Sequence, residues 1–165
     1  MSIARFLHVS EEQYAADQRL PDALPDSGIP LPRRATTGSA GYDFVCTAEV
    51  TLQPGEAVTI PTGLRCEMQP GWVLMLFPRS GLGFKHQVHL ANTVGVIDSD
   101  YFHAANEGHI MVRLANGQSP CTVGSHAVTI AKGERFCQGV FLPHGLAEEE
   151  TVLADREGGF GSTGK

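Results

Sequence analysis

The chain has 165 residues, of which 42% are hydrophobic and 18% are charged, and its formal net charge at pH 7 is −6. This length and composition are typical of one soluble globular domain, and the acidic balance argues against broad binding to nucleic acid or to an anionic membrane. Residues 1–30 contain no long apolar run, so we expect neither a signal peptide nor a membrane span.

The predicted elements begin with one short helix. Ser10-Glu-Glu-Gln13 has the pattern of a capping box, in which the serine and glutamine side chains satisfy each other's backbone N–H groups. It predicts a helix over residues 10–18. Four prolines in residues 21–34 exclude a further helix and predict an extended connector. We therefore assign residues 1–29 to an N-terminal helix and connector.

From Thr36 onward, short runs rich in β-branched and aromatic residues alternate with glycine and proline turns. These runs predict ten strands, near residues 42–46, 49–52, 57–60, 64–68, 72–77, 87–91, 109–115, 121–123, 127–130 and 137–142. Many short strands without a long helix predict an all-β sandwich, jelly roll or barrel. We assign residues 30–150 to this β core.

The cysteines and histidines give no pattern typical of a metal site. Four cysteines fall in predicted strands without C-x-x-C spacing: Cys46, Cys66, Cys121 and Cys137. We expect them to be reduced, which fits a cytoplasmic protein. His86 and His89 are three residues apart in one predicted strand, so they would face opposite sides of it and would not share a metal ion.

Pro78-Arg-Ser-Gly-Leu-Gly83 combines groups that bind an anion. Arg79 offers a guanidinium fork, Ser80 a hydroxyl donor, and Gly81 a backbone N–H without an obstructing side chain. The segment predicts a phosphate-binding loop, and an ordinary turn is the alternative.

Asp98 and Asp100 lie two residues apart in the segment 92–101, so on a strand they would share one face. Asp98 follows Val96 and Ile97, an apolar setting that would desolvate the carboxylate and make it a better base. The alternative is a β-turn rich in aspartate and serine.

The last ten residues, 156–165, cannot maintain a fold of their own, because four glycines surround Phe160 and little apolar surface is available. Such a segment is suited to order over a planar, anionic ligand. Phe160 could stack on a base, while Arg156 and backbone N–H groups meet phosphate oxygens. A frayed terminus is the alternative.

Two more segments complete a set of five: one carries Asp43 just inside a strand, and the other carries Gln138 in an otherwise apolar strand. In order and spacing, the five segments resemble the motifs of the homotrimeric dUTP diphosphatases (dUTPases). The matching pieces are Ala40-Gly-Tyr-Asp43, Pro78-Arg-Ser-Gly-Leu-Gly83, Gly95-Val-Ile-Asp-Ser-Asp-Tyr101, Arg135-Phe-Cys-Gln138 and Gly158-Gly-Phe-Gly-Ser-Thr-Gly164.

The resemblance implies a jelly-roll-like fold that assembles as a homotrimer, with active sites at the subunit interfaces. Each site would be closed by the C-terminal arm, residues 151–165, of a neighbouring chain. The implied reaction is the Mg²⁺-dependent hydrolysis of dUTP to dUMP and pyrophosphate, by in-line attack of water on the α-phosphorus. This reaction clears dUTP from the nucleotide pool and supplies the precursor of dTMP.

The resemblance also implies roles for single residues. The catalytic ones surround the attacking water and the phosphates: Asp98 as general base, with Arg79, Ser80 and Gln138. Asp43 and Gln138 would contact Mg²⁺ through water only. The implied substrate contacts are Gly81 at the phosphates, Asn92, Gly95, Val96, Ile97 and Met111 in a hairpin around the uracil, Tyr101 under the deoxyribose, and Arg156, Phe160 and Gly161 from the arm.

The chain departs from the family pattern at two places. Residues 102–107 form an insertion after Tyr101, similar to one found in some bacterial and phage members, and Arg156 is one residue nearer to Phe160 than usual. Two other functions stay open. A dCTP deaminase relative would need a glutamate base at the position that Arg113 occupies here, and a binding or regulatory protein could use the insertion as a partner loop.

Overall fold

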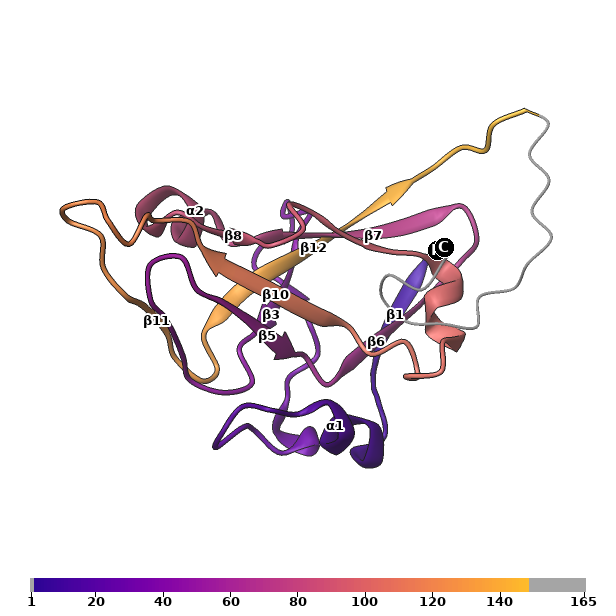
Figure 1. The fold of residues 1–165 in the computed structure, drawn as a ribbon. Helices are drawn as coiled ribbons and strands as arrows, with labels where there is room; N and C mark the ends of the chain where they lie inside the picture. Colours follow the sequence, from indigo (N-terminus) through magenta and orange to yellow (C-terminus); the bar gives the residue numbers. More distant parts are fainter. Residues whose placement is uncertain (1, 149–165) are drawn as a thin grey trace.

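The computed structural model describes residues 2–148 (Figure 1). The predicted arm, with Arg156, Phe160 and Gly161, lies outside the described residues. The strands are β1 (Ala4–His8), β2 (Arg33–Arg34), β3 (Tyr42–Val45), β4 (Val50–Leu52), β5 (Ala57–Pro61), β6 (Leu64–Met68), β7 (Trp72–Pro78), β8 (Val88–Leu90), β9 (Gly95–Ile97), β10 (Met111–Asn116), β11 (Val128–Ile130) and β12 (Arg135–Pro143). The helices are α1 (Glu11–Asp17) and α2 (Ser80–His86), with 3₁₀ turns η1 (Asp26–Gly28) and η2 (Ser99–His103).

The strands form antiparallel sheets around one core. The largest sheet has the order β2-β3-β12-β7-β9, a second has β5-β10-β8, and the pairs β1-β6 and β4-β11 complete the arrangement. Side chains of β4, β8 and β11 alternate between buried and exposed, as expected for strands with one face on the core. Phe44, Phe136 and Leu74 are among the fully buried side chains. Both described α-helices are too short to cross a membrane.

The N-terminal segment packs on its own chain. The predicted helix is present as α1, but β1 was not predicted from the sequence; it pairs along its whole length with β6, far away in the chain. Val9 and Tyr14 are buried in the core. The capping box forms only in half, because the Ser10 hydroxyl accepts from the Gln13 N–H (3.1 Å) while the Ser10 N–H donates to Glu107 (2.8 Å) instead of Gln13.

Three local expectations were wrong. Residues 121–123 form turns instead of a strand, because Pro120 and Gly124 bracket them and no neighbouring strand pairs with them in the described chain. His86 ends α2 instead of sharing a strand with His89. The strand before Asp98 ends at Ile97, so Asp98 caps η2 and Asp100 lies inside it, and the two carboxylates do not share a strand face.

Candidate functional site

Asp43 joins two arginines from different elements. It lies on β3 directly opposite Gln138 on β12, and its side chain is only 7% exposed. One carboxylate oxygen accepts a hydrogen bond from Arg79, and the other accepts from Arg135 at 3.0 Å. Two guanidinium groups neutralise this buried carboxylate, so its burial is compensated and both arginines are held in place.

A basic pocket of about 310 Å³ opens beside this ion-pair group. It is lined by residues from α2 and the start of β12: Arg79, Gly81, Leu82, Lys85, His86, Glu134 and Arg135. The backbone N–H of Arg79 donates to the Phe136 carbonyl at 3.0 Å, which fixes the start of α2 against β12. Ser80 is exposed at the first position of α2. The pocket thus concentrates positive charge where the sequence predicts phosphate binding.

Gln138 is the polar residue predicted within β12, and it is half-buried on the same face of the sheet as Asp43. Its amide oxygen lies close to Gly41, where a Cβ atom would approach it to 2.4 Å. Glycine at position 41 therefore gives the Gln138 side chain its room. Carboxylate and amide oxygens of this kind suit a magnesium ion held through water, because Mg²⁺ keeps much of its hydration shell.

A second, more apolar cavity of about 490 Å³ lies elsewhere on the chain. It is lined by residues of β5, β7, β8, β9, β10 and their loops: Thr59, Leu76, Leu90, Ala91, Asn92, Gly95, Asn106, Met111, Val112 and Arg113. Three predicted uracil contacts, Asn92, Gly95 and Met111, are among them. Val96 is 49% exposed and Ile97 is buried, and neither lines the cavity.

The predicted hairpin around the uracil is not a simple pair of strands. β9 pairs with β7, whereas β10 pairs with β5 and β8, so the two strands belong to different sheets. Asp98 follows β9 and is half-buried at the start of η2. Tyr101 is buried, and its hydroxyl donates to the His109 carbonyl at 2.8 Å.

The structure does not bring all the predicted residues of one chain together. In the β7–β9 ladder, Leu74 lies opposite Ile97 and Leu76 opposite Gly95. Continuing this register puts Asp98 level with Val73, six residues before Arg79. At about 3.3 Å per residue, these six steps separate Asp98 from Arg79 by roughly 20 Å along the sheet. The two cavities have no lining residue in common.

Two residues of these sites were not singled out from the sequence. Arg135 stands in the fourth motif, but its link to Asp43 depends on the pairing of β3 with β12. Asn106 lies in the insertion and reaches the apolar cavity, where it also donates to the Tyr101 hydroxyl at 2.8 Å. The sequence did offer one signal for Asn106, because a polar side chain in an insertion next to a motif is a candidate for lining the site.

Comparison with known proteins gives the family. The sequence model of the dUTPase family matches residues 27–164. The chain belongs to the dUTPase family. It is 44% identical over 142 residues to the deoxyuridine 5'-triphosphate nucleotidohydrolase of Lactococcus lactis, covering 84% of this chain and 91% of that protein. It is 46% identical over 144 residues to the enzyme of the same name from Hahella chejuensis, covering 82% and 88%.

Solved structures agree with the fold. The crystal structure of the Streptococcus mutans dUTPase superposes with a TM-score of 0.65 at 34% identity, covering 87% of this chain and 98% of that one. A mutant dUTPase of Staphylococcus bacteriophage 80alpha, solved with dUpNHpp, superposes with a TM-score of 0.67 at 22% identity and covers 100% of both chains. The all-β, jelly-roll-like dUTPase fold predicted from the sequence is therefore confirmed.

Proposed function

We propose that this chain hydrolyses dUTP to dUMP and pyrophosphate, in active sites that are each shared between subunits of a homotrimer. The family match and the relatives named for this activity support the reaction. The positions of the predicted site residues within one chain support the shared site, and the proposed mechanism depends on this sharing.

The separation of Asp98 from Arg79 is the observation that supports a contribution from a second subunit. A base that aims water at the α-phosphorus and an arginine that binds the same triphosphate must lie near each other, since neighbouring phosphorus atoms share one oxygen. Within one chain the two residues are roughly 20 Å apart along the sheet. The apolar cavity of one subunit and the basic pocket of another would together form a complete site. Phe84 on α2, which is 92% exposed, supplies apolar surface next to the basic pocket for such a contact.

In this site, Asp98 holds the attacking water and accepts its proton, and it also accepts a hydrogen bond from the 3′-hydroxyl of the sugar. Arg79, Ser80 and Gly81 of the adjoining subunit bind phosphate oxygens and stabilise the charge that develops on the leaving pyrophosphate. Asp43 keeps Arg79 in a fixed position, so little reorganisation is needed when the charge develops.

Asp43 and Gln138 are the residues that would hold Mg²⁺ through its waters. The dUTPase of phage phi11 of Staphylococcus aureus is described as coordinating a structural Mg(II) ion. When bound, Mg²⁺ supplies positive charge that neutralises the triphosphate. Asp43 and Gln138 lie opposite each other on paired strands, which supports this assignment. Because Arg79 and Arg135 both donate to Asp43, the same carboxylate also holds these two arginines in place.

Recognition of the nucleoside falls to the apolar cavity. Asn92, Gly95 and Met111 line it, and Val96 and Ile97 contribute the backbone of β9. Cytosine presents a donor where uracil presents an acceptor, and thymine adds a methyl group, so a tight backbone site rejects both. Tyr101 closes the space beside the 2′ position of the sugar.

The arm completes the proposed site, with Phe160 stacked on the uracil, Gly161 beside it, and Arg156 directed to the phosphates.

A cytoplasmic location is part of this proposal, and the free state of the four cysteines supports it. A deaminase is not favoured, because Arg113 lines the cavity and none of its described lining residues is a carboxylate.

The test is release of pyrophosphate from dUTP by the purified protein with Mg²⁺, compared with Asp98→Asn. Loss of a general base should slow turnover by about 10²- to 10⁴-fold. Omission of Mg²⁺ and substitution of dCTP are the controls. Equal rates for the two proteins, or no release by either, would contradict the proposal.

A further inference from the structure

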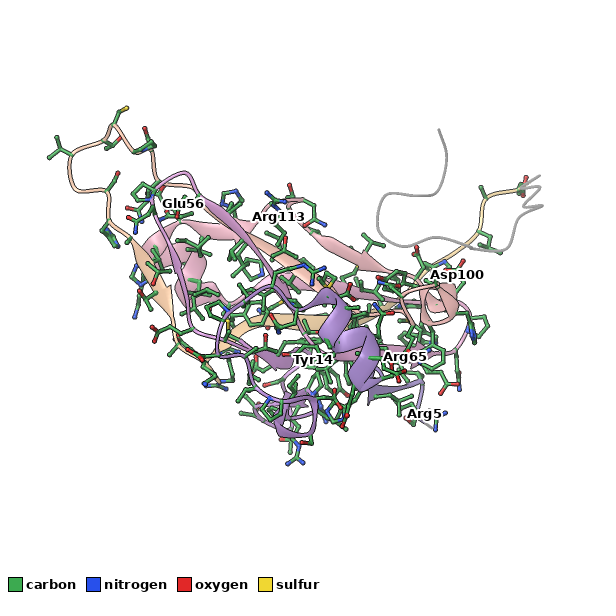
Figure 2. All side chains as sticks on the ribbon, turned by 60° about the horizontal axis from the view of Figure 1, so that its bottom comes forward. Arg5, Tyr14, Glu56, Arg65, Asp100 and Arg113 are labelled. Atoms are coloured by element: carbon green, nitrogen blue, oxygen red, sulfur yellow. The ribbon has the colours of Figure 1, made fainter. Side chains whose placement is uncertain are left out.

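The insertion after Tyr101 is packed against the N-terminal segment. Residues 102–109 run from the second half of η2 towards β10, and side chains of α1 and β6 contact them. Figure 2 labels Tyr14 on α1, Arg65 on β6 and Asp100 in η2, the elements around it. Gly108 and His109 are buried, and neither α1 nor the insertion is one of the five motifs.

Glu107 forms the first link to α1. Its carboxylate accepts from the Ser10 N–H at 2.8 Å and from the Ser10 hydroxyl at 2.7 Å. These hydrogen bonds lower the pKa of Glu107, with Arg65 adding a smaller effect in the same direction. Glu107 therefore takes the place that Gln13 would have in a complete capping box and ties the start of α1 to the insertion.

His109 forms the second link, and its protonation state follows from its partners. The Gly63 backbone N–H donates to His109 Nε2 at 2.8 Å, and a backbone N–H can only donate, so Nε2 carries no proton. The proton of the neutral ring is then on Nδ1, which donates to Asp17 at 2.7 Å. Burial lowers the pKa of His109, which agrees with a neutral ring. Gly63 thus sets the tautomer of His109, and Asp17, the last residue of α1, accepts the Nδ1 proton and holds the ring in position.

Further contacts hold the backbone before and between these two links. Arg65 donates to the Phe102 carbonyl at 2.6 Å, and its guanidinium lies 3.7 Å from the centre of the Phe102 ring. Glu107 and Gly108 both have positive φ, and a Cβ atom at Gly108 would lie 2.6 Å from the Tyr101 carbonyl oxygen. Only glycine fits this close approach, so the insertion turns back directly onto Tyr101.

The position of Tyr101 depends on this segment. Its hydroxyl donates to the His109 carbonyl at 2.8 Å and accepts from the Asn106 amide at 2.8 Å. Asn106 also lines the apolar cavity. A shift of His109 or Asn106 would therefore change the position of Tyr101 and the wall of the cavity together.

We propose that α1, through Asp17 and Ser10, positions the insertion and thereby Tyr101, and so sets how strongly the site prefers 2′-deoxyribose to ribose. This inference rests on the proposed function, in which Tyr101 lies beside the sugar. Asp17 and His109 are positioning residues that act through Tyr101, and neither touches the substrate.

Asp17→Ala removes the acceptor from His109 while leaving the core of α1 in place. The loss of this hydrogen bond should lower the ratio of kcat/KM for dUTP to that for UTP by about three- to tenfold. Asp17→Asn keeps an oxygen acceptor, and because the ring is a neutral donor this variant should restore the ratio. Glu12→Ala removes another carboxylate from α1, at an exposed position, and should leave the ratio unchanged.

Binding of dUMP and UMP, measured by calorimetry on the full chain, separates this inference from the proposed function because it needs no turnover. The parent should prefer dUMP, and Asp17→Ala should reduce that preference by a similar factor. An unchanged preference in Asp17→Ala, or a parent that binds both equally, would overturn the inference. Absence of pyrophosphate release with the binding preference intact would overturn the proposed function alone.

Discussion

Asp98 and Arg79 lie at opposite ends of β7: Asp98 follows the end of β9 beside the first residues of β7, and Arg79 follows the last residue of β7. Figure 1 shows α2, which begins after Arg79, at one end of the molecule and the coil of η2, which begins after Asp98, at the other. The two sets of predicted residues therefore face different parts of the surface. This separation supports the proposal that a complete site is assembled from more than one copy of the chain.

Replacing Asp43 by alanine should weaken both folding and turnover. The change leaves Arg79 and Arg135 close together without their shared carboxylate. Loss of hydrogen bonds to charged groups should lower the free energy of unfolding by about 1–3 kcal/mol. Misplacement of Arg79, which we propose as a phosphate-binding donor, should lower kcat by about 10²-fold or more.

Urea unfolding and pyrophosphate release measure the two effects of Asp43→Ala separately. Asp43→Asn, which keeps an oxygen acceptor, should lie between the alanine variant and the parent. If Asp43→Ala retained full kcat, Asp43 would have no part in positioning Arg79.

The stability of the protein should fall as the pH is lowered below about 6.5, the ordinary pKa of histidine. Burial lowers the pKa of His109 in the folded chain, an effect that outweighs the opposing influence of Asp17. The unfolded chain then binds a proton at a pH where the folded chain does not. The contribution of His109 is fully present above pH 6.5 and is lost as the pH falls towards the lower, folded-state pKa, with a slope of at most about 1.4 kcal/mol per pH unit.

The comparison that isolates this effect uses His109→Gln, whose amide can keep both hydrogen bonds without titrating. Its free energy of unfolding should change less than that of the parent between pH 7 and pH 5. His89→Gln, at an exposed histidine, is the control. Identical pH dependence in the parent and His109→Gln would show that the ring titrates as in the unfolded chain.

The sequence was most informative where residues near one another in the chain act together. The strand positions of Asp43 and Gln138 were predicted from local patterns. Ser80 and Gly81, predicted in a phosphate-binding loop, lie in the first turn of α2, and their phosphate-binding role stays a prediction. The pairing of Asp43 with Arg135 and of Asp17 with His109 could not be predicted, because each joins residues separated by 92 positions. β1 was missed for the same reason, since its partner is β6 and its own five residues are only weakly patterned.

Three of the four cysteines should be unreactive in the folded protein. Burial raises the pKa of the Cys46 thiol to about 11, and that of Cys66 and Cys137 to about 12, so these thiols stay protonated. Cys121, which was predicted in a strand, is exposed in a turn. Titration with an aromatic disulfide at pH 8 should detect one thiol per chain, and four after denaturation. Rapid reaction of more than one thiol in the native protein would contradict the burial.

Removal of residues 157–165 should leave a folded oligomer with greatly reduced turnover. The single change Phe160→Ala isolates the stacking ring, and its loss should lower kcat/KM for dUTP by about five- to a hundredfold. Thermal unfolding should be unchanged in both variants, since the arm would order only over substrate. Full activity after truncation would show that the arm takes no part in the site.

The most direct measurement of the shared active site is complementation between two inactive variants, Asp98→Asn and Arg79→Ala, co-expressed in equal amounts. Each variant retains the residue that the other lacks. A site built from two chains is therefore intact when the Arg79→Ala chain supplies Asp98 and the neighbouring Asp98→Asn chain supplies Arg79. Random assembly of trimers should restore about a quarter of the parent's activity, since each required residue is present with a probability of one half. If both residues served one chain's own site, every site would lack one of them, and the mixture would stay as inactive as either variant alone.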